Sequence, residues 1–184
     1  MVTHYDPEWD DVFVNDRTGG VFLVTEGSRD FVQGQLVQVT GFSGVGEFAP
    51  VVMKARLRVL GQGRLPRPRR VTYQDLFSGT LDSEFVEVQG TIRSAVLDKN
   101  RLNLYLKTGA GHLRATVVNV HSADLERLVS AQVTLRGACG STFTKRGQLT
   151  GIIIHVQSLH DVIIREPRHE PLEAPLAHVC AFAS

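Results

Sequence analysis

The sequence has few cysteines and no long hydrophobic run, and these absences exclude several classes of protein. Only two cysteines occur in 184 residues, Cys139 and Cys180, and neither belongs to a Cys-x-x-Cys pair. Two cysteines are too few for a disulfide framework. They could still form a single bridge, so the cysteine count does not determine the redox compartment. No apolar run approaches the roughly 18 residues that a membrane helix needs. Met1 is followed by neither a basic nor an apolar stretch, so we expect no signal peptide.

An excess of charge of one sign is lacking as well. The 20 Lys and Arg residues nearly balance the 19 Asp and Glu residues, which leaves a formal net charge of +1. Such a chain is not a general polyanion binder, although a local basic patch is compatible with this sum. A hydrophobic fraction of 42% with 21% charged residues is ordinary for a globular protein and excludes wholesale disorder.

Helical periodicity is also scarce, whereas short runs rich in Val, Leu, Ile, Phe and Thr recur between turn residues and predict a mainly β protein. We expect two short helices, at 73–78 after Thr72 and at 123–129 after Ser122, each with its preceding residue as the cap. The predicted strands are Val12–Asn15, Gly20–Val24, Leu36–Phe42, Met53–Leu60, Phe85–Leu97, Arg101–Thr108, His112–Val118, Ala131–Ala138, Leu149–Val156 and Asp161–Arg165.

The two halves of the chain resemble one another. Val12–Gly20 matches Leu102–Ala110, because each is a strand that runs into a Thr-Gly turn. Val37–Gly44 matches Val133–Gly140, because each is an alternating strand that ends in Gly-x-x-Gly. The run Gly61–Arg70 between the halves contains two prolines and two glycines, and it predicts an extended linker.

Five strands with a helix between the third and the fourth are the layout of the OB-fold, a partly open Greek-key barrel. We therefore predict a mainly β fold with two OB-fold-like five-stranded Greek-key barrels in tandem and short helices. The expected divisions are a first barrel at 1–62, a linker and short helix at 63–80, a second barrel at 81–167 and a C-terminal tail at 168–184.

The repeat also predicts a shortened first strand in the first barrel. Met1–Thr3 aligns with Thr91–Arg93, so the counterpart of Phe85–Gly90 is missing from the first half. Either the chain starts within a strand, or another segment supplies that edge.

Acidic and basic residues are segregated along the chain. The acids Asp6, Glu8, Asp10, Asp11 and Asp16 suggest a Ca²⁺ site or an acid–base pair, but their spacing matches no EF-hand, and we favour a polar loop. Residues 54–70 hold seven Lys and Arg and no acid. Lys54, Arg56 and Arg58 alternate and should share one strand face, either as a phosphate-tracking stripe or, the interpretation we favour, as a solvated face.

Motifs that carry catalysis are not found. There is no Gly-x-Ser-x-Gly elbow, no Walker loop and no metalloprotease helix motif, and the spacing of the seven histidines does not converge. We therefore expect no enzyme activity, no cofactor and no metal. Cys139 has no base beside it in the sequence and is expected to be a buried structural thiol.

Five segments carry a family resemblance: Val2–Trp9, Phe13–Phe22, Gly41–Pro50, Leu65–Arg69 and Asp82–Gly90. They resemble the tandem OB-like module in the sensor regions of bacterial sensor and hybrid histidine kinases. The resemblance implies an extracytoplasmic, periplasmic location; without it we expect a cytoplasmic protein. No kinase core and no membrane span accompany these segments, so the chain is expected to be a sensory module without phosphotransfer activity of its own.

From these features we predict a non-catalytic sensory module that binds an unidentified small molecule, glycan or protein. Loops on a rigid barrel would bind, and the interdomain angle would carry the signal. The alternative is a single-stranded nucleic-acid-binding OB-fold protein, with nucleic acid ranked below the other partners. Phe13 and Phe22 lie on strands that OB-folds use for stacking but are expected to be mostly core, and Tyr5 and Trp9 flank a proline-containing loop. The predicted binding residues are Tyr5, Trp9, Phe13, Arg17, Phe22, Phe48, Lys54, Arg56 and Arg58.

Overall fold

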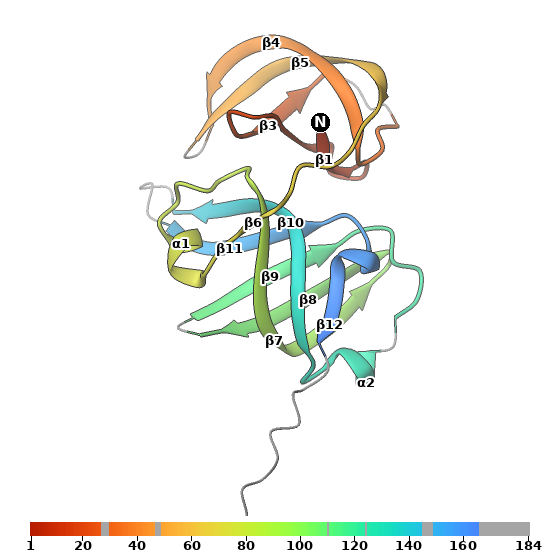
Figure 1. Ribbon diagram of the computed structural model, residues 1–184, viewed down its shortest axis with the longest axis vertical. Coiled ribbons are helices and arrows are strands. Elements are labelled where there is room, and N and C mark those ends of the chain that lie inside the picture. The colour runs from red at the N-terminus through yellow and green to blue at the C-terminus, as the bar shows by residue number, and fades with distance from the viewer. Residues whose placement is uncertain (27–29, 47–48, 110, 124, 145–148, 166–184) are drawn as a thin grey trace, which may run out of the picture.

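The structure is a computed structural model that describes residues 1–26, 30–46, 49–109, 111–123, 125–144 and 149–165. It contains two mixed, mainly antiparallel sheets, each of which curls into a barrel-like unit. We call these units the first and the second body, and the first lies above the second in Figure 1. This arrangement confirms the predicted mainly β, two-barrel fold class.

The second body has the strand order that an OB-fold predicts. Its main strands are β7 (Phe85–Asp98), β8 (Arg101–Thr108), β9 (Gly111–Val117), β10 (Gln132–Phe143) and β11 (Leu149–Val156). They lie in the order β7-β8-β9-β11-β10, with β9 parallel to β11, and β10 pairs back with β7 to close the barrel. Short strands β6 (Arg69–Arg70) and β12 (Val162–Arg165) and a 3-10 turn at Leu159–Asp161 complete it.

Strand β7 bends and changes its partner at Gly90. Residues Phe85–Thr91 pair with β10, and residues from Thr91 to Asp98 pair with β8. A Cβ at position 90 would lie 2.9 Å from the carbonyl oxygen of Lys107, so the crossing requires glycine. Val86 and Val88 of the first part are buried and contribute to the core of the second body.

The two helices lie near the positions that the sequence predicts. Helix α1 (Tyr73–Phe77) begins with a capping box, in which Thr72 Oγ1 accepts from Asp75 N and the Asp75 carboxylate accepts from Thr72 N. Helix α2 (Leu125–Leu128) connects β9 to β10 and buries Leu128.

The first body repeats this strand order with a shorter first strand. It consists of β1 (Val2–Asp6), β2 (Asp11–Asn15), β3 (Gly20–Thr25), β4 (Gln35–Val45) and β5 (Pro50–Gln62), in the order β1-β2-β3-β5-β4. Strands β3 and β5 are parallel, as β9 and β11 are. In the described residues, β1 pairs with β2 and forms no ladder with β4. The first core is correspondingly small and is built around Val2, Val12, Leu23 and Leu57.

The long hairpin of β4 and β5 extends further than the sequence predicts. Strand β5 runs to Gln62, so it includes the first residues of the expected linker. Arg69 and Arg70 then pair in parallel with Val86 and Glu87 of β7, which attaches the rest of that segment to the second body.

Candidate functional site

The two bodies are joined by an ion pair between Arg101 of β8 and two carboxylates, Asp6 at the end of β1 and Glu8 just after it. Arg101 Nη2 lies 2.6 Å from each oxygen of Asp6, and Arg101 Nη1 also donates to Glu8. Its guanidinium lies over the Trp9 ring, 4.3 Å from the ring centroid. Burial alone would lower the pKa of Arg101, but the bonds to Asp6 and Glu8 outweigh it and raise that pKa. Arg101 is therefore held in its charged form by hydrogen bonds to both acidic side chains.

Further hydrogen bonds extend this contact on both sides. Tyr5 N donates to Gln157 Oε1 at 2.8 Å, and Gln157 Nε2 donates back to Tyr5 O at 3.1 Å. At the turn between β2 and β3, Gly20 N donates to Glu84 Oε1 at 3.1 Å, and Phe85 N donates to Asn15 Oδ1 at 3.1 Å. The first body thus contacts both the β8–β11 side and the start of β7.

An aromatic cluster lies beneath the ion pair. The His155 ring centroid is 5.0 Å from that of Phe13 and 5.4 Å from that of His4. Burial, then the charge of Arg114, lowers the pKa of His155 to about 4, and burial lowers the pKa of His4 well below its usual value. Both imidazoles are therefore neutral at pH 7, and both His4 nitrogens lack a hydrogen-bond partner in the described structure.

A cleft of about 650 Å³ opens beside this cluster, between the two bodies. Its apolar wall comes from the first body and includes Phe22, Val24 and Met53. Burial raises the pKa of Asp11 to about 6 and also raises the pKa of Asp82, two carboxyls at its rim. The cleft can hold a mostly apolar molecule that carries a polar group.

A second, open surface lies on the outer face of β8 and β9, which we call the β8–β9 face. Tyr105 of β8 is 47% exposed and stands opposite Arg114 of β9, and Lys107 stands opposite His112. Arg93, on the adjoining bulge of β7, lines the same hollow of about 390 Å³ as Tyr105 and Arg114. Arg93, Lys107 and Arg114 form no ion pair with any described acidic residue. Among the described residues, the face therefore presents one exposed aromatic ring together with three cations that have no acidic partner: Arg114 opposite the ring, Arg93 in the same hollow and Lys107 two residues further along β8.

The predicted binding aromatics separate in the structure. Tyr5 was expected to flank a loop and to be available for binding, but it lies in β1, is only 3% exposed and packs against Phe31, because its side chain belongs to the small first core. Phe13 is also buried, and it packs against Phe22 with a centroid distance of 5.0 Å. Trp9 is 58% exposed, but its ring contacts Arg101. Phe13 and Phe22 line the cleft together, while Phe48 lies outside the described residues.

The predicted cations lie on other surfaces. Arg17 is exposed in the turn after β2. Lys54, Arg56 and Arg58 are exposed on the outside of β5 between the buried Ala55 and Leu57, as their alternation predicts. Arg56 pairs with Glu26 at 3.5 Å. These cations do not join Phe13 and Phe22 in one site, and the acidic loop pairs with Arg101 instead of with this basic row.

The remaining chemical candidates have structural roles. In the described part of the chain no three His, Cys, Asp or Glu side chains converge as a metal site would require. Cys139 is buried, and burial raises the pKa of its thiol to about 12, which makes the thiol unreactive at neutral pH. Cys180 lies outside the described residues. No helix in the described ranges has the length and apolar character needed to cross a bilayer.

The sequence analysis missed the β8–β9 face, although a signal for it was present. Tyr105 and Lys107 alternate on one predicted strand, and His112 and Arg114 alternate on the next. In the predicted OB layout these are the second and third strands, whose outer face binds ligands in many such barrels. These cations are spread over several strands, whereas the charge at 54–70 is denser and continuous in the sequence.

Comparisons with known proteins add a fold likeness only. No family model matches the chain, and no curated protein matches it. Among solved structures, the chain is similar to the aspartyl-tRNA synthetase from Entamoeba histolytica, with 10% identity over 73% of this chain and 28% of that one and a TM-score of 0.40. It is also similar to a murine DNA-binding protein bound to double-stranded DNA, with 10% identity over 85% of each chain and a TM-score of 0.38. A third similar structure is the p204 HINb domain, with 11% identity over 90% of this chain and 93% of that one and a TM-score of 0.37. The chain spans about a quarter of the synthetase, and at these TM-scores no likeness carries a functional argument.

Proposed function

We propose that the chain is a non-catalytic module that binds single-stranded nucleic acid on the β8–β9 face. The observation that carries this proposal is the exposed Tyr105 ring among Arg93, Lys107 and Arg114, none of which has a described acidic partner. A base stacks on an aromatic ring whatever its sequence, and cations beside that ring bind the flanking phosphates. This is the alternative that the sequence analysis ranked second, now located on the second body.

The position of the face supports the same proposal. The first body covers one end of this surface, where Arg101 and His155 are engaged, and leaves the part around Tyr105 and Ile153 open. An extended strand of nucleic acid can run across β8 and β9 without displacing the ion pair. Oligosaccharides also bind OB barrels through exposed aromatics, but they would not use the unneutralised cations.

A second candidate function rests on the cleft between the bodies. Its apolar wall with Phe13 and Phe22, together with its place between the two barrels, fits a sensory module in which a small molecule changes the interdomain angle. This is the function expected from the resemblance to sensor histidine kinases, and with it a periplasmic location. The two candidates use different residues, so one set of variants separates them.

The test is titration of the protein into a fluorescently labelled, mixed-sequence single-stranded oligonucleotide at low and at physiological salt. The proposal predicts saturable binding that weakens as salt rises and is lost when the three cations of the β8–β9 face are removed. Binding that survives their removal, or no binding at low salt, contradicts it. Loss of oligonucleotide binding when Phe22 alone is changed would instead favour a binding site in the cleft.

A further inference from the structure

The second body shows what closes a barrel of this topology. Phe85–Thr91 of β7 pairs antiparallel with residues 132–138 of β10. Two side chains of this segment, Val86 and Val88, point into the core and are almost completely buried. On the outer side, Glu87 stands opposite Arg136, and the two groups are 2.9 Å apart. Alternate apolar residues thus fill the barrel while an acidic residue between them meets a cation outside.

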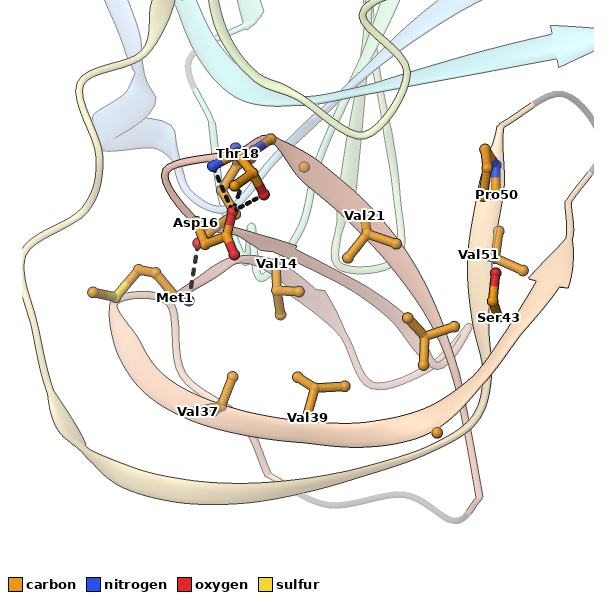
Figure 2. A pocket seen from close by; sticks show the side chains of 15 residues that line it. Met1, Val14, Asp16, Thr18, Val21, Val37, Val39, Ser43, Pro50 and Val51 are labelled. Atoms are coloured by element: carbon orange, nitrogen blue, oxygen red, sulfur yellow. Dashed lines mark hydrogen bonds between the residues drawn. The ribbon is translucent and has the colours of Figure 1, made fainter.

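The first body has an open cavity at the corresponding place. It measures about 610 Å³ and lies between β4 and the β2–β3 hairpin. Figure 2 shows Val14 and Val21 on one side and Val37 and Val39 on the other, with empty space between them. Val21, Val37 and Val39 are only partly covered, whereas Val133 and Leu135, which match Val37 and Val39 in the repeat, pair with β7 and are almost completely buried. The cavity is therefore an unfilled part of a barrel core.

The backbone beside this cavity is also unpaired. Strand β4 pairs with β5 from Gln35 to Val45, and in the described residues its other edge carries no ladder. An open edge with unpaired N–H and C=O groups is a template for another strand. No proline lies in β4 to block such pairing.

Arginines on the neighbouring strand β5 indicate which charge a strand added to β4 would carry on its outer side. On the outer face, Gln38 of β4 stands opposite Arg58 of β5, and Thr40 stands opposite Arg56. Arg58 has no ion pair with a described residue, and Arg56 has a single exposed one with Glu26. A strand laid along the free edge of β4 would have β4, with Gln38 and Thr40, between its outward side chains and this basic row, whereas Glu87 and Arg136 stand directly opposite each other on neighbouring strands in the second body.

We propose that the β4 edge of the first body accepts an extended peptide strand from a partner protein, apolar at alternate positions and acidic between them. The peptide adds to the sheet by main-chain hydrogen bonds, and its apolar side chains enter the cavity between Val21 and Val39. Its acidic side chains lie beside Gln38 and Thr40 of β4, on the same outer face as the long Arg56 and Arg58 side chains of β5. This site is separate from the β8–β9 face and does not depend on nucleic-acid binding.

The experiment uses a labelled peptide with the sequence of Ser83–Thr91, which has the required pattern, titrated into the full chain. We expect saturable binding that is lost in a control peptide with serine at the two positions of Val86 and Val88. Val39→Glu should weaken binding about tenfold or more because it places a charge in the apolar cavity, while Val96→Glu, an exposed site on the second body, should not. No binding, or equal binding by both peptides, overturns the proposal.

A charge exchange keeps the test independent of folding. Arg58→Glu should weaken binding about twofold to fivefold, and a peptide with lysine at the position of Glu87 should restore it.

Two other results would identify a different occupant. If deletion of 166–184 is required for the peptide to bind, the chain's own tail occupies the β4 edge. If the peptide dissociates a dimer in sedimentation, a second copy occupies it. Either of these two results overturns the assignment to a partner.

Discussion

Arg101 and Asp6 lie 95 residues apart in the sequence and meet in a bidentate ion pair, with Arg101 Nη2 2.6 Å from each carboxylate oxygen. The two side chains are only 11% and 5% exposed. Because each charge has lost most of its water, each depends on the other, and the pair fixes how the first body sits on the second. The open part of the β8–β9 face is the part that this placement leaves uncovered.

Removal of one partner of this pair should strongly destabilise the chain. Arg101→Ala leaves the buried Asp6 carboxylate uncompensated and should lower the free energy of unfolding by about 3–5 kcal/mol in urea denaturation. Arg70→Ala is the matched control, because the Arg70 side chain is 87% exposed and should contribute less than about 1 kcal/mol. Equal losses in the two variants would show that the Arg101 pair does not hold the bodies together.

Acidification should weaken the contact between the bodies through His155. The pKa of His155 is lowered from 6.5 to about 4 by burial, so the unfolded chain binds the proton more tightly than the folded one. Stability is therefore fully present above pH 6.5 and is lost as the pH falls toward 4, by up to about 3 kcal/mol. In denaturation measured across that range, His155→Gln should remove the His155 contribution to this loss and leave those of His4, whose pKa burial also lowers, and of Asp11, which acts in the opposite direction.

Asp11 acts in the opposite direction and provides a control for the pH profile. Burial raises its pKa to about 6, so its contribution to stability falls as the pH rises from about 4 to about 6. In an Asp11→Asn background the acid-induced loss should become steeper. A shallower acid-induced loss of stability in that background would contradict the account in which His155 causes the loss and Asp11 opposes it.

The turn between β2 and β3 should tolerate no side chain at Gly20. A Cβ there would collide with the carbonyl oxygen of Ser83 and approach Asn15 Oδ1 to 2.9 Å. Gly20→Ala should separate this turn from the start of β7 and destabilise the chain by about 1–3 kcal/mol. Arg17→Ala, at an exposed position in the same turn, should stay within about 0.5 kcal/mol of the parent in the same denaturation assay.

Much of the fold could be predicted from local patterns, but the contact between the bodies could not. Alternation and turn residues gave the strands, and the match of Val12–Gly20 to Leu102–Ala110 gave the repeat. Tyr5 was misplaced because a short apolar segment beside Pro7 resembles a loop until its pairing with Val12 is known. The partnership of Arg101 with Asp6 leaves no local signal, since it depends on how two finished barrels pack. The basic row of Lys54, Arg56 and Arg58 was located correctly on one strand face, but its distance from Phe13 and Phe22 is a property of the tertiary structure.

The stacking role of Tyr105 has its own test. Tyr105→Ala should weaken single-strand binding by about 1–3 kcal/mol without changing its salt dependence, because it removes a stacking surface and no charge. Tyr105→Phe should retain most of the affinity. If Tyr105→Phe loses as much as Tyr105→Ala, the hydroxyl rather than the ring makes the contact, and stacking is excluded.

The most direct measurement compares two charge-matched triple variants by fluorescence anisotropy of one labelled single-stranded oligonucleotide at several salt concentrations. Arg93→Ser, Lys107→Ser and Arg114→Ser together remove the cations of the β8–β9 face, and Lys54→Ser, Arg56→Ser and Arg58→Ser together remove the same charge from β5. Our account predicts that the first variant loses binding and the steep salt dependence, while the second stays close to the parent chain. Loss of binding in the second variant alone, or in neither, would contradict the placement of the nucleic-acid site on the β8–β9 face.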